Sequence, residues 1–272
     1  MHEMLENRLK DWSLRLLAEA SSGATASVYK VAQPTGNIAA LKIYPRGHAG
    51  NEIGAAPYLR ALATRGVSKV LAVETDALLT QWLDGPPLSD LSGMSLRSAD
   101  QRLAWLALDL LAAPRPKVIL PPLSDWLADA LDRLARLAPS DNRSCLVEVV
   151  GRGQRALAHA LDQQPLHGDL HHGNIVITTA GPKAIDAKGV IGPKPYELAN
   201  ALRHPSATAP VCGTALAERL AFFATTLDIP PTDLAFWTAI KTALSIVWRG
   251  TLSSAADRRD MQRMRACLEL CP

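Results

Sequence analysis

The hydrophobic pattern of this chain changes near residue 84, and the change limits the folds that its 272 residues can adopt. Before that point, short apolar runs over residues 27–33 and 38–44 flank a turn-like Pro-Thr-Gly-Asn sequence, as in a hairpin. Beyond it, apolar residues recur every three or four positions, which is typical of helices. The change predicts an α+β fold with two lobes, a small β-rich lobe over residues 1–83 and a larger, mostly helical lobe over residues 84–272.

The same two periods locate the remaining elements. Further strands are expected over residues 70–73 and 77–83, and an amphipathic helix over residues 1–17 places Leu5, Leu9, Trp12 and Leu16 on one side. Helices are expected over residues 99–113, 123–137, 144–161, 196–202, 215–226, 232–252 and 255–270. A polar, β-like insert over residues 166–191 interrupts these helices, and we expect the functional site there.

Composition excludes several classes of protein. With 48% hydrophobic and 20% charged residues, the chain has the composition of a globular protein and not of a disordered one. A net charge of +3 without a long Lys/Arg run indicates no nucleic-acid partner. No window reaches the ~18 apolar residues that span a bilayer, and the N-terminus lacks the apolar segment of a signal peptide. We therefore expect no membrane partner and a cytoplasmic location; the oligomeric state is not indicated.

The insert carries two polar clusters at the two ends of a predicted hairpin. HGDLHHGN, residues 167–174, directly precedes an apolar strand over residues 175–177. After a turn at residues 180–182, a second strand leads to Asp186. Because a short turn brings the second strand back beside the first, the two clusters are expected to converge.

Three oxygen-bearing side chains in these clusters, Asp169, Asn174 and Asp186, suggest a particular chemistry. Oxygen ligands suit Mg²⁺ better than zinc or copper, and protein-bound Mg²⁺ usually completes its shell with water and substrate phosphates. A nucleoside triphosphate is then the expected substrate. Phosphoryl transfer also needs a carboxylate that orients the acceptor hydroxyl, and Asp169 can supply it.

HGDLHHGN also resembles the catalytic loop of the aminoglycoside-phosphotransferase and choline-kinase-like family, which reads H-G-D-x-x-x-x-N. The stretch IDAKGVIGPKPYELANALRHP is most similar to the streptomycin 6-kinase and hydroxyurea phosphotransferase branch. The resemblance implies a protein-kinase-like fold, ATP and Mg²⁺ as cofactors, and a small-molecule acceptor. It also implies that Asp169 is catalytic and that Asn174 and Asp186 are the metal ligands.

The resemblance requires charged residues around the phosphates. Lys42 is the single charge in an apolar strand, and an unpaired buried lysine is costly, so a role at the α- and β-phosphates is expected. Glu52 is the expected partner of Lys42, although Pro57 means that the helix near it is kinked or starts late. Lys188, two residues after Asp186, is expected to neutralise phosphate charge.

Two further segments complete the implied nucleotide site. The small-residue loop over residues 21–27, with Ser22 and Gly23, is expected to cover the phosphates through its backbone N–H groups. The segment from Gln81 to Leu83 is expected to bind adenine through its backbone.

Two other functions remain open at this point. A nucleotide-binding pseudokinase would use the same residues without turnover, although the presence of Lys42, Asp169, Asn174 and Asp186 argues against it. A metallo-hydrolase could use the alternating His167, Asp169 and His171, with the adjacent His172, as metal ligands. Of the histidines only His204 follows this group, and Lys42 and Asn174 would be unexplained. In the kinase interpretation His167 is a scaffold residue of the loop, and His171 and His172 are polar loop residues.

The acceptor is the least determined part of the prediction. The resemblance suggests an aminoglycoside, of the streptomycin type, or a sugar hydroxyl. A polycationic antibiotic would favour an acidic acceptor pocket, yet residues 206–272 contain no excess of acids over bases. A sugar or amino-alcohol metabolite is therefore an equal candidate.

Overall fold

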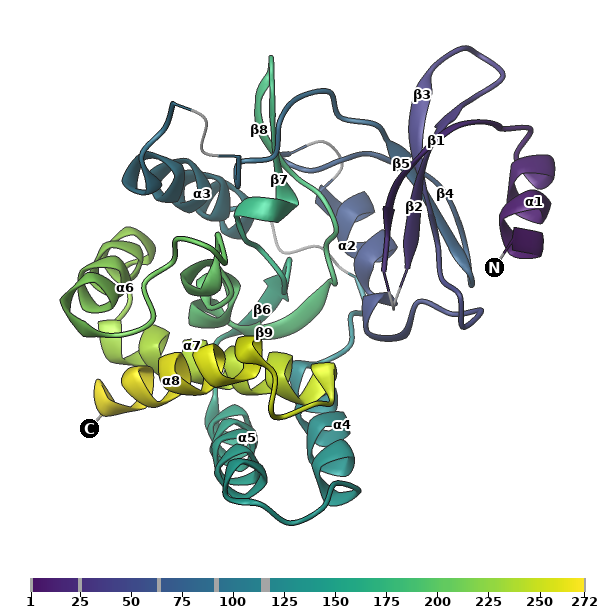
Figure 1. The fold of residues 1–272 in the computed structure, drawn as a ribbon. Helices are drawn as coiled ribbons and strands as arrows, with labels where there is room; N and C mark the ends of the chain where they lie inside the picture. Colours follow the sequence, from purple (N-terminus) through teal and green to yellow (C-terminus); the bar gives the residue numbers. More distant parts are fainter. Residues whose placement is uncertain (1, 24–25, 63–64, 91–92, 114–117, 272) are drawn as a thin grey trace.

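The computed structural model describes residues 2–23, 26–62, 65–90, 93–113 and 118–271 (Figure 1). An antiparallel five-stranded sheet near the N-terminus adjoins a larger helical part, so the predicted α+β fold is confirmed. The sheet has the order β1-β2-β3-β5-β4. Its strands are β1 (Arg15–Ser22), β2 (Ser27–Ala32), β3 (Ile38–Ile43), β4 (Val70–Glu74) and β5 (Ala77–Gln81).

Strand β1 corrects the sequence-based prediction of a helix over residues 1–17. The helix α1 (His2–Asp11) ends earlier, Ser13 takes the left-handed conformation with φ 52°, and Leu16 lies in β1. Every side chain of β1 is exposed, so its pattern carries no sign of a strand. Pairing with β2 decides the conformation, because it satisfies backbone groups at the edge of the sheet.

The face of the sheet that carries Leu41 and Ile43 packs with Leu5 of α1 in an apolar cluster of its own. Since side chains alternate along a strand, Lys42 lies on the opposite face, toward the helical part. Helix α2 (Ala55–Leu62) lies between the sheet and that part, and Tyr58 and Leu62 belong to the apolar cluster of the helical lobe. Helix α2 therefore separates the sheet from the helical part, and the sheet face that bears Lys42 is turned toward that part.

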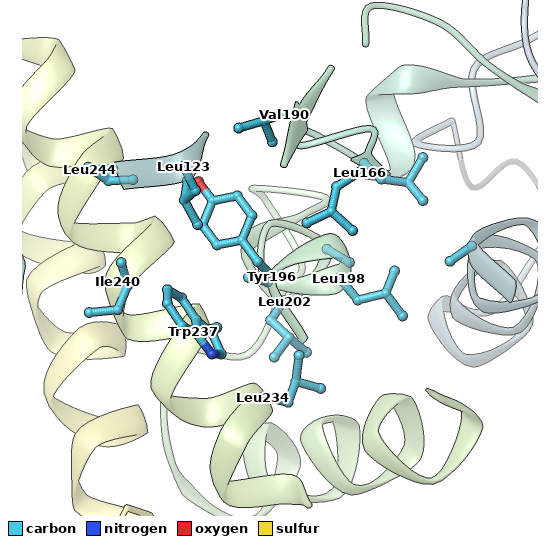
Figure 2. Packing of buried hydrophobic residues seen from close by; sticks show 14 of the residues in the cluster. Leu123, Leu166, Val190, Tyr196, Leu198, Leu202, Leu234, Trp237, Ile240 and Leu244 are labelled. Atoms are coloured by element: carbon cyan, nitrogen blue, oxygen red, sulfur yellow. The ribbon is translucent and has the colours of Figure 1, made fainter. Parts of the chain in front are cut away.

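In the described part of the larger lobe, six helices contribute buried apolar residues to one core cluster. They are α3 (Leu96–Leu111), α4 (Leu123–Ala135), α5 (Asp141–His159), α6 (Gly213–Leu227), α7 (Pro231–Arg249) and α8 (Ala255–Glu269). Figure 2 shows part of this cluster, with Trp237 beside Tyr196. Helix α7 is buried along most of its length and packs against α4, α5, α6 and α8. None of the helices in the described ranges is both long and apolar enough to cross a membrane.

The helix predicted over residues 196–202 is a second correction. The structure has two short 3-10 turns there, η3 (Lys194–Leu198) and η4 (Ala201–Arg203). Pro195 lies in the first turn of η3, where a proline is tolerated, so it does not account for the interruption between the two turns.

The polar insert forms two strand pairs that enclose the predicted site. β6 (Gln163–Leu166) pairs with β9 (Val190–Pro193), and β7 (Ile175–Thr178) forms the predicted hairpin with β8 (Gly181–Ala184). The turn η2 (His172–Asn174) leads into β7. The backbone N–H of Ile185 donates to the Asn174 carbonyl at 2.9 Å, and that of Lys188 donates to the His167 carbonyl at 2.9 Å. The two polar clusters therefore converge, as the sequence predicts.

Candidate active site

A cavity of about 570 Å³ lies between the sheet and the segment that follows the catalytic-loop sequence. Seven of the residues predicted to bind nucleotide or metal line it, namely Lys42, Glu52, Gln81, Leu83, Asn174, Asp186 and Lys188. The loop over residues 21–27 contributes Ser21 and Ala26 to the lining; Ser22 and Gly23 do not line the cavity. Ala24 and Thr25 of the same predicted loop lie outside the described residues. The roles of all these residues remain predictions.

Four charged side chains meet at the floor of this cavity. The Lys42 ammonium contacts both the Glu52 carboxylate and Oδ1 of Asp186. The Lys188 ammonium donates to Oε1 of Glu52 at 2.5 Å and lies 3.8 Å from Oδ2 of Asp186. The Tyr44 hydroxyl donates to Oε2 of Glu52 at 3.1 Å. The Lys42–Glu52 pair is present as expected, and Glu52 joins the two lysines, which the sequence did not indicate.

These contacts stabilise the charged forms of the groups. Burial raises the pKa of Asp186, but the Lys188 and Lys42 ammonium groups outweigh it and hold that pKa below its usual range. Burial lowers the pKa of Lys188, but Asp186 and Glu52 outweigh it and hold that pKa above its usual range. Asp186 has φ 59°, a conformation that few residues other than glycine adopt. An outlier of this kind is often found at functional sites.

The position of Glu52 explains how it reaches Lys42 despite Pro57. Glu52 ends a short turn, η1 (Gly50–Glu52), and α2 begins only at Ala55. Pro57 therefore lies in the first turn of α2, where its missing N–H has no helical partner to lose.

Two glycines, Gly54 and Gly189, form a close backbone contact between the segment that follows Glu52 and the residues that follow Asp186. A methyl group on Gly189 would overlap the carbonyl oxygen of Gly54, and one on Gly54 would overlap that of Gly189. Gly189 also has φ 66°. The two backbones thus approach more closely than any residue with a Cβ atom permits, and this approach brings Glu52 to Lys188.

The loop at residues 167–174 is held by buried polar side chains. Nδ1 of His167 accepts from the Asp169 N–H at 3.3 Å, so its Nε2 carries the proton and donates to the Ile185 carbonyl at 3.0 Å. Burial lowers the pKa of His167 to about 4, which keeps the ring neutral. The carboxylate of Glu197 accepts the N–H groups of His167 and Gly168, each at 3.2 Å. His167 is therefore the scaffold residue that was predicted, and Glu197 is a second one.

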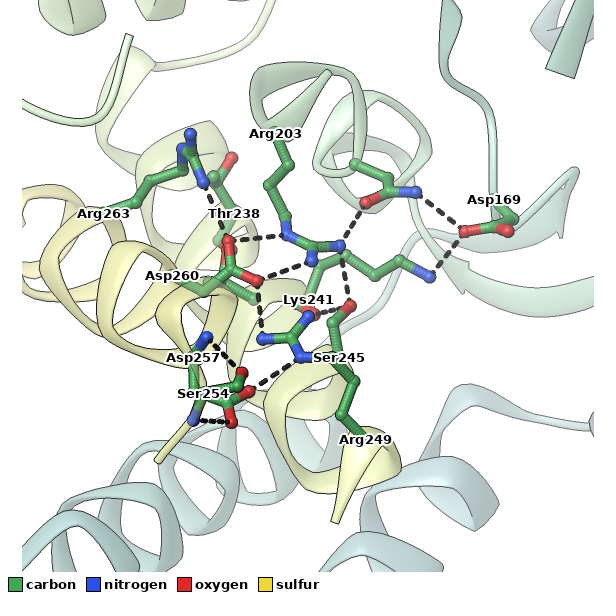
Figure 3. A network of polar contacts seen from close by, with 12 residues as sticks. Asp169, Arg203, Thr238, Lys241, Ser245, Arg249, Ser254, Asp257, Asp260 and Arg263 are labelled. Carbon is green, nitrogen blue, oxygen red and sulfur yellow. Dashed lines mark hydrogen bonds and ion pairs between the residues drawn. The ribbon is translucent and has the colours of Figure 1, made fainter. Parts of the chain in front are cut away.

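Asp169 has two partners that the sequence did not reveal (Figure 3). Oδ1 accepts from Nδ2 of Asn200 at 2.8 Å and lies 2.9 Å from Nζ of Lys241. Burial raises the pKa of Asp169, but the ammonium groups of Lys241 and Lys188 hold it well below its usual range. Asp169 is therefore a carboxylate at neutral pH.

Lys241 could have been found from its pattern. It is the only charge in the otherwise uncharged run 234–248, as Lys42 is in residues 38–44. Asn200 carries no such signal, because a polar residue near a proline-rich turn is common.

The donor set of the cavity fits a magnesium ion. Nδ2 of Asn174 donates to the backbone carbonyl of Asp169 at 3.0 Å, and its Oδ1 has no hydrogen-bond partner among the described residues. The carboxylate of Asp186 lies on the same cavity and is 36% exposed. One amide oxygen and one carboxylate are typical of a Mg²⁺ that takes its remaining ligands from water and phosphates.

The model of the "Aminoglycoside/hydroxyurea antibiotic resistance kinase" family matches residues 11–251. The chain belongs to this family. It is also 29% identical over 195 residues to streptomycin 3''-kinase from Klebsiella pneumoniae, covering 68% of this chain and 70% of that protein. The predicted kinship is therefore confirmed, and the protein is a small-molecule kinase.

Solved structures of other small-molecule kinases share the fold. A choline/ethanolamine kinase family protein from Mesorhizobium loti has a TM-score of 0.66 at 16% identity, covering 98% of this chain and 94% of that one. A thermostable mutant of aminoglycoside phosphotransferase APH(4)-Ia, in ternary complex with AMP-PNP and hygromycin B, has a TM-score of 0.69 at 13% identity and covers 97% of each chain. The protein-kinase-like, two-lobed fold is confirmed.

The histidines in and next to the loop at residues 167–174 contact other side chains. His171 stacks on His204 with ring centroids 3.9 Å apart, and Nε2 of His172 lies 2.9 Å from the Asp100 carboxylate, which Arg219 also binds. Within the described ranges no group of three His, Cys, Asp or Glu residues could hold a metal ion. The geometry therefore disfavours the metallo-hydrolase, and His172 is a buried core residue where a polar loop residue was expected.

Proposed function

We propose that this kinase uses ATP and transfers its γ-phosphate to a hydroxyl group of a small molecule, with Asp169 as the catalytic carboxylate. The observation that carries the proposal is the position of Asp169. Both of its partners bind Oδ1, so Oδ2 has no partner among the described residues and can receive an acceptor hydroxyl. The loop that bears Asp169 continues directly into the cavity through Asn174.

The nucleotide is proposed to occupy the cavity between the lobes. The segment from Gln81 to Leu83 would bind the adenine, and Lys42 and Lys188 would bind the phosphates. Both lysines hold carboxylates in the structure described here, and phosphate oxygens are equivalent acceptors for them. The AMP-PNP complex of a structural neighbour supports this use of the cavity.

Asn174 and Asp186 would hold Mg²⁺. When bound, the ion would neutralise charge on the phosphates during transfer. Asp169 orients the acceptor so that its oxygen faces the γ-phosphorus. As the new P–O bond forms and the bond to the ADP oxygen breaks, the proton of the acceptor hydroxyl passes to Oδ2 of Asp169.

For the acceptor we propose an aminoglycoside first, because the curated relative is a streptomycin 3''-kinase. The absence of an acidic excess over residues 206–272 keeps a sugar or amino-alcohol metabolite as the second candidate. Screening the purified protein for ATP consumption with streptomycin, other aminoglycosides, choline analogues and sugars decides between them. Nucleotide binding without turnover of any acceptor would favour a pseudokinase.

Two substitutions test the assigned roles separately. Asp169→Ala is expected to lower kcat by roughly 10²–10⁴-fold while ATP binds as before, because the acceptor hydroxyl loses its partner and no residue proposed to bind ATP is changed. Asp186→Ala is expected to abolish Mg²⁺-dependent ATP binding. Titration calorimetry with and without Mg²⁺, beside a turnover assay, measures both. Full turnover in Asp169→Ala, or unchanged Mg²⁺-dependent binding in Asp186→Ala, would contradict the respective assignment.

A further inference from the structure

The buried ammonium group of Lys241 is part of the catalytic side of the molecule, although its helix lies in the core. Lys241 stands in the middle of α7, and its side chain is only 4% exposed. Figure 3 shows the side chain extended from α7 to Asp169. Its Nζ lies 2.9 Å from Oδ1 of Asp169 and donates to the Gly168 carbonyl at 3.3 Å. Both contacts fall on the loop proposed to perform the transfer.

Three aromatic rings surround the same ammonium group. Its Nζ lies 5.7 Å from the ring centre of Trp126, 5.8 Å from that of Tyr196 and 5.4 Å from that of Trp248. Ring faces attract a cation but accept no strong hydrogen bond, so they stabilise the charge without drawing its N–H groups away. The cage therefore leaves Asp169 and Gly168 as the strong acceptors of Lys241.

Lys241 and Asn200 bind the same oxygen of Asp169 from different elements. Asn200 precedes η4 and donates to Oδ1 at 2.8 Å. Two donors on one carboxylate oxygen fix the rotation of the group about its last bond. The other oxygen, Oδ2, is left without a partner among the described residues, so its direction is set by the pair on Oδ1.

We propose that Lys241 is a positioning residue for phosphoryl transfer, which holds the Asp169 carboxylate by Oδ1 so that Oδ2 faces the acceptor. The inference rests on the proposed catalytic role of Asp169. The alternative is that Lys241 only balances a buried charge and that its loss affects stability alone. The two differ in kinetics, because a positioning residue alters kcat through Asp169 and leaves the nucleotide site unchanged.

The test compares Lys241→Met and Lys241→Arg with the unaltered protein. Lys241→Met is expected to lower kcat by about 10- to 100-fold, the usual effect of a misplaced reactive group, with KM for ATP within about twofold. Lys241→Arg keeps a cationic donor and is expected to recover a large part of that loss. Unchanged kcat in folded Lys241→Met, or equal losses in both variants, would overturn the proposal.

The same substitution in the Asp169→Ala background separates the two proposals. If Lys241 acts through Asp169, adding Lys241→Met there leaves the residual turnover unchanged, whereas an independent role lowers it by a further 10-fold or more. Full turnover of Asp169→Ala would instead contradict the function proposed above. Should Lys241→Met not fold, Trp248→Leu opens one wall of the cage and keeps the charge. A few-fold loss of kcat that disappears with Asp169→Ala supports the proposal, and no loss opposes it.

Discussion

Two clusters of charged side chains flank the loop over residues 167–174, called the catalytic loop for its proposed role, and they are built in opposite ways. The cleft cluster, defined as Lys42, Glu52, Asp186 and Lys188, joins two cations with two anions across the two lobes. The anchor cluster lies within the helical lobe, where three arginines share the carboxylate of Asp260 (Figure 3). These arginines are Arg203, Arg249 and Arg263, each with a contact of 2.8 Å to Asp260.

This contrast indicates which of the two clusters can exchange its ion-pair partners. In the cleft cluster each carboxylate contacts both lysines, and the Asp186 side chain is 36% exposed on the cavity. A nucleotide bound as proposed would replace a carboxylate there without leaving a lysine unpaired. The Asp260 carboxylate is buried, and its three arginines hold α7, α8 and η4 together. Substitutions in the anchor cluster should therefore alter stability, and those in the cleft cluster should alter binding.

The largest expected effect is that of Asp260→Ala. Removing this carboxylate leaves buried guanidinium groups without their shared partner, and breaking a buried ion pair in this way typically destabilises a protein by about 3–5 kcal/mol. Urea unfolding measures the change. Asp129→Ala is the matched control, because it breaks an exposed Arg133–Asp129 pair and should change stability very little. A similarly small loss of stability in both variants would mean that the anchor cluster does not stabilise the helical lobe.

Arg203 connects the anchor cluster to Asp169, the proposed catalytic residue. It donates to Oδ1 of Asn200 at 2.7 Å, and Asn200 donates to Asp169. Asp260→Ala that remains folded should therefore also lose turnover.

Gly189→Ala is expected to have the next largest effect. It acts at the backbone contact between Gly54 and Gly189, which brings Glu52 to Lys188. The added methyl group overlaps the carbonyl oxygen of Gly54, so two backbones must separate, which typically destabilises by about 1–3 kcal/mol. ATP affinity should fall as well, because Glu52 moves away from Lys188.

Gly36→Ala supplies the control for Gly189→Ala. Gly36 also has positive φ, 85°, but a methyl group there meets no atom within 4 Å. It therefore carries the backbone strain without the clash. Thermal unfolding and ATP titration of both variants measure the difference. Equal behaviour of the two variants would show that the contact between Gly54 and Gly189 is not needed.

Much of the fold could be predicted from hydrophobic periodicity, because most elements bury one face. Strand β1 could not, since all its side chains are exposed and only its backbone pairing holds it. The turns η3 and η4 were also missed as such, because their apolar residues are spaced as in a helix. The division at residue 83 remains a prediction; the last strand of the sheet ends at Gln81.

The residues of the candidate site also divide into those that the sequence predicted and those that it did not. The residues of the catalytic-loop sequence and Lys42 could be found because each lies in a short, recognisable pattern. Asn200 and Lys241 could not be assigned as partners of Asp169, because both are distant from it in the sequence. Asn200 lies 31 residues from Asp169, and Lys241 lies further away. A lone lysine in an apolar helix predicts that a partner exists, since an unpaired buried charge is costly, but not which partner it is.

The smallest expected effect concerns His204, whose ring contacts the catalytic loop. It follows Arg203 in the chain and stacks on His171 of the catalytic loop with an interplanar angle of 12°. Burial, with His171 and Arg203 nearby, lowers the pKa of His204 to about 2, whereas an unfolded histidine has a pKa of about 6.5. As pH falls below about 6.5 the unfolded chain binds the proton first, so the stability that the neutral ring contributes above that pH is lost.

His204→Phe keeps a ring in the stack but cannot bind a proton. Between pH 7.5 and pH 5.5 the unaltered protein should lose about 1.4 kcal/mol more stability than this variant, because one fewer group is protonated on unfolding. Urea unfolding of both proteins at the two pH values measures that difference, and comparing the proteins cancels the titration of the groups that do not contact His204. An equal loss in both proteins would show that His204 titrates alike in the folded and unfolded chain. The stacked rings of His171 and His204 would then be accessible to protons in the folded protein. The catalytic loop would also be held to the anchor cluster less tightly than the contacts of Arg203 indicate.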